Sequence, residues 1–354
     1  MLTFRRLDVN TCDWERIDAV PDRVVYQTRE WVGFIAKAQG ADPVIADVFD
    51  GQERLVARFT GLIVKRFGLR ILGSPFPGWN TGPLGFNLLE PVDRRLLAES
   101  LVCYAFGPLR CVHLEILDPV FAGCDLAALG FRSTPQRTYR VALARDEEAI
   151  FADMSSACRR AIRKASKSGV TVEQASGVEF ADEYYAQLED VFAKQSLQPG
   201  HGVDRVRQLI EAMEPTGRLL LLRSVSPHGE RIATGIFLGM NQLAFYWGGA
   251  SWRVHQQLRP NELLMWHAIR YWRGRGLAYL DLGGGTEEGF ADYKRKFGTE
   301  EVIVPALRRS RFRLVGAARD AAATLTTSPL VQSRGRARGR APGISARAEA
   351  PQRA

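Results

Sequence analysis

The residues best suited to chemistry form one short stretch: an aspartate, then glycines, then a row of cations. Asp281 ends an apolar run, the glycines from Gly283 to Gly285 follow it, and Lys294 opens a triplet of basic residues. A carboxylate could act as a general base or orient an acceptor amine. A lysine ammonium could neutralise a phosphate or a developing oxyanion. Asp281 and Lys294 are therefore candidate catalytic residues.

Both side chains also fit ordinary structural roles. An aspartate beside glycines commonly caps a turn, and three adjacent cations usually face solvent. The basic triplet is nevertheless wedged between Tyr293 and Phe297, which should anchor it. The glycine run is not a phosphate loop, because no Lys-Ser/Thr follows it and its spacing is not Gly-x-Gly-x-x-Gly. The candidate substrate-binding residues of this stretch are Gly283, Gly284, Arg295 and Lys296.

A helix and a buried strand must position this stretch. Pro260 suits a first helical turn, and Glu262 in the same turn suits the helix dipole. Apolar residues then recur at helical period until glycines end the pattern before Leu277. The apolar run from Leu277 to Leu282 predicts a short buried strand. The aspartate and the glycines would then lie at the carboxyl edge of a sheet, where open α/β sheets usually bind ligands.

A second candidate group ends the strand expected at residues 243–248. Tyr246 and Trp247 lie there, followed by Gly248 and Gly249. The glycines would permit a β-bulge whose N–H groups could face a substrate carbonyl. Alternatively, the strand simply stops at the glycines. We take Tyr246 as a candidate catalytic residue, with Trp247 and Gly249 as candidates for substrate binding.

A third group lies on the helix expected over residues 155–168. At about 100° per residue, its arginines and lysines fall on one face and its apolar residues on the other. Arg160 and Arg163 on the cationic face could bind tRNA phosphates, a nucleotide-linked sugar or an anionic lipid carrier. The alternative is an ordinary solvated helix face, since Lys and Arg are also good helix formers.

The remaining pattern predicts a mixed α/β fold rather than an all-parallel sheet. A Gly- and Pro-rich stretch at 73–87 is expected to be a long surface loop. The expected strands are 2–9, 44–49, 54–65, 69–72, 111–117, 136–143, 170–174, 218–225, 232–239, 243–248, 277–282 and 301–307. The expected helices are 28–39, 91–106, 124–129, 147–168, 181–194, 204–213 and 260–276.

A helix-strand pattern that occurs twice in the sequence indicates two related halves. One helix beginning at Pro91 leads to the strand HLEIL, and another beginning at Pro260 leads to YLDL. Glu115 and Asp281 would then occupy equivalent places. Only Asp281 is followed by glycines and a cationic segment, which suggests that the second half kept the chemistry.

Length and composition set the remaining limits. The 354 residues predict two domains, 1–145 and 146–315, and a disordered arginine-rich tail, 316–354. The tail has seven arginines against Asp320 and Glu349, so most of the net charge of +9 lies there. Five scattered cysteines indicate neither a disulfide framework nor a metal site. No apolar window is long enough for an integral membrane segment and no signal peptide is evident, so we expect a cytoplasmic protein.

The order of helix, three-stranded meander, helix and further strand is that of the GNAT acyltransferase fold. More specifically, PNELLMWHAI, GLAYLDLGGGTEEG and YKRKFG resemble the FemAB-like branch of that superfamily. The stretches QTREWVGFIAKAQG and SSACRRAIRKASKSGVTVE resemble the openings of its two halves. The resemblance covers Leu2 to Leu307 and implies tandem GNAT-like domains, each a mixed twisted sheet flanked by helices.

The resemblance also implies an acyltransferase, with the lysine of its Lys-x-x-Phe-Gly order at Lys294. The donor is acyl-CoA or aminoacyl-tRNA, used as a co-substrate with no bound cofactor. The segment QQLRPN replaces the Gln/Arg-x-x-Gly-x-Gly/Ala loop that often holds CoA, and its Arg259 and Asn261 are candidate substrate-binding residues. The acceptor would be an amine or hydroxyl of a cell-envelope, peptidoglycan or polysaccharide precursor, carried as a small molecule or a lipid- or nucleotide-linked glycan.

We expect direct attack by the acceptor, because no Cys-His or Ser-His-Asp arrangement can be assembled from the sequence. The alternative function is a non-catalytic GNAT-fold protein that binds RNA or an anionic glycan. The sequence does not specify an oligomeric state.

Overall fold

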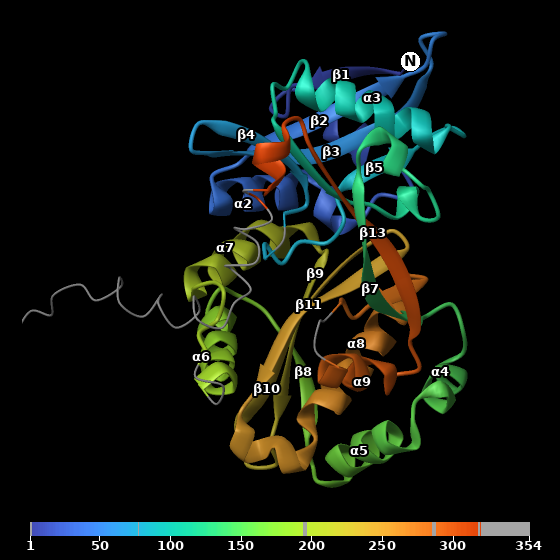
Figure 1. Ribbon diagram of the computed structural model, residues 1–354. Coiled ribbons are helices and arrows are strands. Elements are labelled where there is room, and N and C mark those ends of the chain that lie inside the picture. Colours follow the sequence, from blue (N-terminus) through green and yellow to red (C-terminus); the bar gives the residue numbers. More distant parts are fainter. Residues whose placement is uncertain (1, 77, 194–196, 285–287, 318, 320–354) are drawn as a thin grey trace, which may run out of the picture.

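The computed structural model describes residues 2–76, 78–193, 197–284, 288–317 and 319. Figure 1 shows one long, twisted mixed sheet with helices on both faces. The strands are β1 (Thr3–Leu7), β2 (Asp42–Phe49), β3 (Leu55–Arg66), β4 (Leu69–Ser74), β5 (Gly85–Leu88), β6 (His113–Leu117), β7 (Arg132–Ala142), β8 (Thr171–Ala175), β9 (Leu219–Val225), β10 (Arg231–Met240), β11 (Leu243–Ser251), β12 (Tyr279–Asp281) and β13 (Glu300–Ser310).

The helices cover the sheet in two groups. In the second half, α6 and α7 pack on the face that carries Leu221 and Leu238, and α5 and α8 pack on the face that carries Leu220 and Phe237. The α-helices are α1 (Trp14–Asp18), α2 (Arg29–Gln39), α3 (Arg94–Phe106), α4 (Glu147–Asp153), α5 (Ser156–Lys167), α6 (Phe180–Ala193), α7 (Val203–Met213), α8 (Pro260–Gly274) and α9 (Glu288–Arg295). Short 3-10 helices are η1 (Val25–Gln27), η2 (Pro119–Phe121), η3 (Ala127–Leu129), η4 (Glu214–Thr216) and η5 (Arg253–Leu258).

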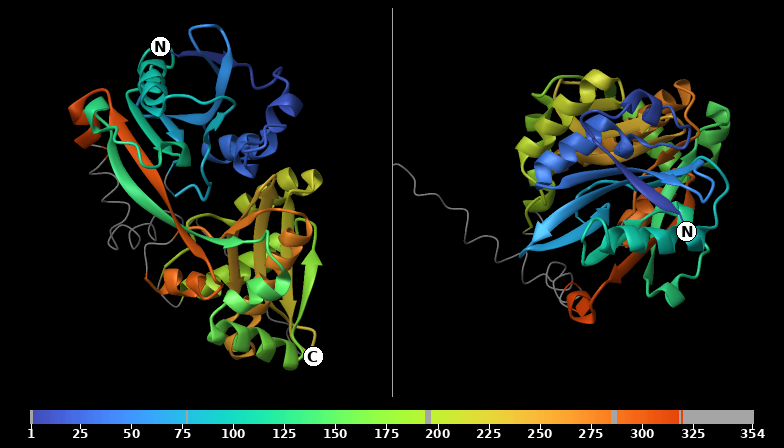
Figure 2. Two further views of the ribbon diagram at one scale, coloured as in Figure 1. Left: turned by 90° about the vertical axis from the view of Figure 1, so that its right-hand side faces the viewer. Right: turned by 90° about the horizontal axis from the view of Figure 1, so that it is seen from above.

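The sheet runs in the order β1-β2-β3-β4-β6-β13-β7-β12-β11-β10-β9-β8, with β5 beside β3. The pairs β4–β6 and β11–β12 are parallel, and the other pairs are antiparallel. This confirms the expected mixed fold. Figure 2 shows the long strands β7 (green) and β13 (orange to red) running between the two halves.

Outward from the β7–β13 pair, the two sides of the sheet show the same succession of antiparallel and parallel strand pairs. On one side β13 pairs with β6, and on the other β7 pairs with β12. Glu115 lies opposite Arg308, just as Asp281 lies opposite Arg140, with Gln136 and Val304 paired at the centre. This confirms the expected equivalence of the two acids. The domain limits at residues 145 and 315 stay predictions, because β7 and β13 each pair across them.

Several expected elements differ in their limits. The helix expected over 147–168 is broken at Met154 and Ser155, where the Ser155 hydroxyl caps α5 by accepting from the Cys158 N–H. The helix expected from residue 91 begins at Arg94, after the cap Asp93. The cationic segment after the glycine run, for which no helix was expected, contains α9. Apart from residues 316, 317 and 319, the tail prediction lies outside the described residues.

The expected surface loop at 73–87 is largely buried instead. Phe76, Trp79 and Leu84 are buried, and the segment ends in β5. Glycines and prolines signalled the irregular backbone correctly. The aromatic side chains among them keep the segment in the interior, because burying them against the second half removes a large apolar area from water.

A shared core joins the two halves. Tyr26 and Trp31 of the first half belong to the same buried cluster as Leu238 and Phe245 of the second. The rings of Tyr26 and Phe245 lie 4.6 Å apart between centroids. The relative position of the halves therefore depends on hydrophobic burial as well as on strand pairing.

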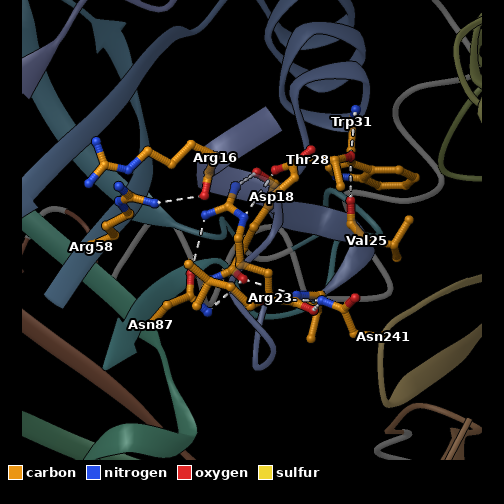
Figure 3. Close-up of polar contacts among 12 residues, drawn as sticks. Arg16, Asp18, Arg23, Val25, Thr28, Trp31, Arg58, Asn87 and Asn241 are labelled. Atoms are coloured by element: carbon orange, nitrogen blue, oxygen red, sulfur yellow. Dashed lines mark hydrogen bonds and ion pairs between the residues drawn. The ribbon is translucent and has the colours of Figure 1, made fainter. Parts of the chain in front are cut away.

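A buried arginine organises the polar part of this junction (Figure 3). Arg23 is 1% exposed. Its Nε donates to Asp18 Oδ1 at 3.1 Å, its Nη1 donates to Asn87 Oδ1 at 3.2 Å, and its Nη2 donates to the Gln27 carbonyl. Burial lowers the pKa of Arg23 to about 10, against the opposing effect of Asp18, so the group remains charged at neutral pH.

The second half reaches this arginine through a turn. Asn241, in the β10–β11 turn at a φ of 52°, donates from Nδ2 to the carbonyls of Val20 and Arg23 at 3.1 and 3.0 Å. Asparagine is one of the few residues that adopt this left-handed conformation easily. The turn is thus shaped to present an amide to the first half.

Replacing Arg23 with methionine keeps the side-chain length but removes the donor to Asn87. It also leaves Asp18 with the longer ion pair to Arg218, at 3.6 Å, in place of the closer one. Loss of one partner of a buried ion pair costs about 3–5 kcal/mol, so we expect the free energy of unfolding in urea to fall by about that amount. Arg54→Met is the matched control, because the Arg54–Asp50 pair lies at the surface and such pairs contribute about 0–1 kcal/mol. Equal losses in both variants would contradict the role assigned to Arg23.

Candidate functional site

Two adjoining cavities lie between the halves. The larger is about 820 Å³ and is lined by the segment after β4, by β6, β11 and β13, and by α6 and α9. The smaller is about 230 Å³ and reaches Asp281, Tyr26 and Thr138. Residues that line both cavities are Asn80, Thr81, Leu117, Gln136, Tyr246, Trp247 and Gly284.

The end of β11 forms one wall of both cavities and contains a β-bulge. Ile236 of β10 pairs with Gly248, and Phe237 pairs with Tyr246, so Trp247 is the extra residue. This confirms the bulge expected from the glycines. On its other side, β11 pairs with β12 only as far as Phe245, while β11 itself continues to Ser251. The two parallel strands therefore part at the position of the cavities.

A reciprocal pair of hydrogen bonds fixes the bulge to the first half. Trp247 Nε1 donates to the Asn80 carbonyl at 2.9 Å, and Asn80 Nδ2 donates to the Trp247 carbonyl at 3.1 Å. Trp247 was expected to bind substrate, and its ring does line the larger cavity. Its polar atoms, however, hold the segment after β4 in place.

Two tyrosines lie over the bulge glycines. A side chain at Gly248 would collide with the Tyr184 hydroxyl, and one at Gly249 would collide with the Tyr246 hydroxyl. Burial raises the pKa of Tyr246 to about 12 and raises that of Tyr184 as well. Both phenols therefore carry their protons at neutral pH and can donate hydrogen bonds into the cavity. Tyr184 had no role in the sequence analysis.

His201 is a second residue that sequence reasoning missed. It lines the larger cavity, and its ring lies 5.3 Å from that of Trp247 between centroids. Burial, with a further contribution from Arg205, lowers its pKa to about 4. The imidazole is therefore neutral, and its buried Nε2 has no hydrogen-bond partner among the described residues. The sequence signal was weak: one histidine in the glycine-rich connection PGHG.

Asp281 has both carboxylate oxygens occupied. Oδ1 accepts from the Gly283 N–H at 2.7 Å and from the Thr138 hydroxyl, and Oδ2 accepts from Arg140 Nε at 3.0 Å. These contacts are those of an aspartate that caps a turn, which was the structural alternative to a catalytic role. Asp281 still lines the smaller cavity, where burial and, secondly, this carboxylate raise the pKa of Tyr26. A catalytic role for Asp281 stays a prediction.

Lys294 closes the glycine turn from the opposite side. Its Nζ donates to the Gly283 carbonyl at 2.9 Å and to the Gly284 carbonyl. The side chain is 8% exposed and lines the larger cavity. Burial lowers its pKa to about 8, although the nearby Asp281 opposes this. The expected pair of Asp281 and Lys294 thus holds one turn between them.

The other sequence candidates lie outside both cavities. Arg295 pairs with Asp292 at 2.9 Å, and Asn261 Nδ2 donates to Ser251 Oγ at 2.9 Å. Arg259 is the N-cap of α8, with a φ of 57°. The remaining members of this group are Lys296, whose Nζ lies over the Tyr293 ring, and Arg160 and Arg163, which are exposed on α5. Their roles in substrate binding stay predictions.

Glu115, the counterpart of Asp281, lies in the wall of the larger cavity and is 3% exposed. Its Oε1 bonds with His113 Nε2 at 3.2 Å and accepts from Arg319 Nε at 2.5 Å. Burial opposes ionisation, but the hydrogen bonds of His113 and Arg319 outweigh it and lower the pKa of Glu115 to about 2. Oε2 is buried and has no partner among the described residues.

The described part of the chain contains no group of three or more His, Cys, Asp or Glu side chains that could hold a metal ion. Within the same residues, no helix combines the length and the apolar character needed to cross a membrane.

Comparisons with known proteins agree with this architecture. Residues 152–295 match the family model described as "Acetyltransferase (GNAT) domain". No curated protein sequence matches the chain significantly. Among solved structures, FemX superposes with a TM-score of 0.68 at 12% identity, covering 86% of this chain and 96% of its own.

Two further solved structures share the fold. A tandem GNAT protein from the clavulanic acid biosynthesis pathway superposes with a TM-score of 0.53 at 13% identity, covering 88% of this chain and 99% of its own. The C-terminal domain of a putative lysylphosphatidylglycerol synthetase from Agrobacterium fabrum superposes with a TM-score of 0.53 at 12% identity, covering 87% of this chain and 94% of its own. Residues 152–295 therefore match a GNAT acetyltransferase domain, and the chain as a whole shares the fold of FemX and of the tandem GNAT protein.

Proposed function

We propose that the protein transfers an acyl group from acyl-CoA or aminoacyl-tRNA to an amine bound in the larger cavity. The observation that carries this proposal is the parting of β11 and β12 at the Trp247 bulge, beneath two protonated tyrosines. An acyl carbonyl placed there would meet donors before its oxygen becomes charged, which is the arrangement that lowers the barrier to acyl transfer.

The residues of the cavity can perform the transfer by direct attack. The acceptor nitrogen forms a bond to the acyl carbon, and the electron pair moves onto the carbonyl oxygen, where the Tyr246 hydroxyl donates. His201 Nε2 takes the proton that the nitrogen loses. The oxyanion then collapses, the bond to the leaving sulfur or oxygen breaks, and that atom takes the proton from His201. Lys294 positions the glycine turn at the edge of this site.

An amine acceptor is favoured by Glu115. This carboxylate is charged, buried and has one oxygen free of partners among the described residues. Arg319 pairs the charge through Oε1, but a buried oxygen that lacks a hydrogen-bond donor is still costly, so the free Oε2 is suited to an ammonium group. With a pKa of about 2, Glu115 is a weaker base than His201, whose pKa is about 4, so the proton of the reaction is assigned to His201. Its proposed role is to hold a cationic group of the acceptor.

The acceptor class remains the one suggested by the sequence, a cell-envelope or polysaccharide precursor. The fold shared with FemX and with a putative lysylphosphatidylglycerol synthetase domain supports that class. The solved tandem GNAT structure without AcCoA supports acyl-CoA as a donor to test, and FemAB-like relatives support aminoacyl-tRNA. The first experiment must identify the acyl donor and the acceptor precursor.

The first test is a donor screen with purified protein, in which mass spectrometry follows acylation of amine acceptors by acyl-CoA or charged tRNA. We expect one donor class to be consumed and Tyr246→Phe to lower kcat at least tenfold, because one oxyanion donor contributes about 10²–10³ in rate at its strongest. Tyr271→Phe, on α8 and outside the lining of both cavities, is the control. Equal rates in the two variants, or consumption of neither donor, would overturn the proposal.

Glu115→Gln tests the acceptor site separately. The amide keeps the shape but removes the charge, so KM for a cationic amine acceptor should rise about tenfold, the effect of an interaction of about 1.4 kcal/mol. KM for the acyl donor should stay within twofold. If both KM values rise together, the residue supports the fold of the cavity and does not recognise the amine.

Lys294 predicts a pH dependence of stability. Its pKa of about 8 in the folded protein lies below the ordinary 10.5, so between these values the unfolded chain binds more protons and stability rises with pH. From pH 7.5 to 9.5, the free energy of unfolding of the native protein should gain about 2 kcal/mol relative to Lys294→Met. Lys167→Met, at an exposed position, should show the native slope. The same slope in Lys294→Met would contradict the assignment.

A further inference from the structure

Four of the eight exposed large apolar side chains of the described residues lie on two segments at one edge of the first half. Phe67 and Leu69 are at the β3–β4 turn, with exposures of 103% and 43%. Phe312 and Leu314 follow β13, with exposures of 53% and 85%. Contiguous exposed apolar groups of this kind usually mark an interaction site.

Backbone hydrogen bonds place these two segments at the same end of the sheet. The Val112 N–H donates to the Arg70 carbonyl at 2.9 Å, and the Arg311 N–H donates to the Val112 carbonyl at 2.9 Å. Arg70, Val112 and Arg311 thus form one row across β4, β6 and β13. In Figure 1 the β3–β4 turn extends to the left of the first half, and the orange-red segment after β13 lies in front of the sheet. We call residues 65–70, 110 and 311–314 the basic apolar edge.

The charges of this edge have one sign. Residues 64–70, 109–113 and 310–316 contain no aspartate or glutamate. Arg70 Nε donates to the Leu109 carbonyl at 2.9 Å, and Arg311 Nη1 donates to the Phe106 carbonyl at 3.1 Å, so these bonds orient the groups without neutralising them. The cations of the edge are Lys65, Arg66, Arg70, Arg110, Arg311 and Arg313.

We propose that the basic apolar edge docks the protein onto an anionic membrane surface. Phe67 and Leu314 would enter the boundary between headgroups and acyl chains, and the surrounding cations would contact lipid phosphates. A symmetric contact with a second copy would instead bring like charges together, which is unfavourable. The arginine-rich sequence that follows residue 319 adds charge of the same sign. This inference is independent of the proposed acyl transfer.

Co-sedimentation of the full chain with lipid vesicles tests the proposal. Vesicles of phosphatidylcholine with about one third phosphatidylglycerol should bind the protein, and pure phosphatidylcholine vesicles should bind it at least tenfold more weakly, because each nearby Lys or Arg adds to the attraction. The paired change Phe67→Ser with Leu314→Ser should weaken binding to anionic vesicles about tenfold. Val254→Ser, exposed by 80% on the second half, is the matched control.

A charge variant separates the edge from the rest of the chain. Arg66→Glu with Arg313→Glu should weaken anionic vesicle binding at least tenfold while leaving the thermal unfolding midpoint within a few degrees. If both paired variants bind as the native protein does, another part of the chain provides the attraction and the proposal is wrong. Loss of a native dimer in the apolar variant, without any vesicle binding by the native protein, would assign the edge to a second copy instead.

Discussion

The pairing of β7 with β13 is the interaction on which the rest of the structure depends. Nine residue pairs, from Glu300–Arg140 to Arg308–Arg132, join these strands. Each strand also pairs with a strand of the opposite half, so β6 and β12 lie on the two sides of this ladder. Without this ladder, Glu115 and the Trp247 bulge would belong to separate surfaces. The larger cavity exists because the ladder brings them into one wall.

The sequence predicted the local elements well and the long-range arrangement only through a resemblance. Periodicity and caps located α2, α8 and the meander, because those patterns depend on neighbouring residues. The pairing of β7 with β13 depends on register between residues 160 or more positions apart, which no local pattern encodes. The inward course of the 73–87 segment was missed for the same reason, since Phe76 and Trp79 find their partners only in the assembled protein.

The residues of the candidate site also fall into two groups, those that the local sequence indicated and those that only the folded structure reveals. Tyr246 and Asp281 were found because glycines beside them signal special backbone, and Lys294 was found from its charge and the Lys-x-x-Phe-Gly order; all three line the cavities. Arg160 and Arg163 were chosen for charge alone, and charge on a helix face does not say where the helix lies. His201 and Tyr184 could be recognised only when folding placed them beside Trp247 and Gly248. Glycine context was thus a better guide than charge alone.

The two equivalent acids show how related halves can acquire different tasks. Asp281 is neutralised by Arg140 on the adjacent strand and by the N–H of its own turn, so its oxygens are committed to the sheet. Glu115 is held on one oxygen by His113 and Arg319, and its other oxygen has no partner in the described chain. A buried, unpaired carboxylate oxygen is unfavourable in the empty protein, and that cost can be recovered when a cation binds. Under the proposed function, the half expected from sequence to have lost its chemistry would recognise the acceptor, while the other half would supply the site of transfer.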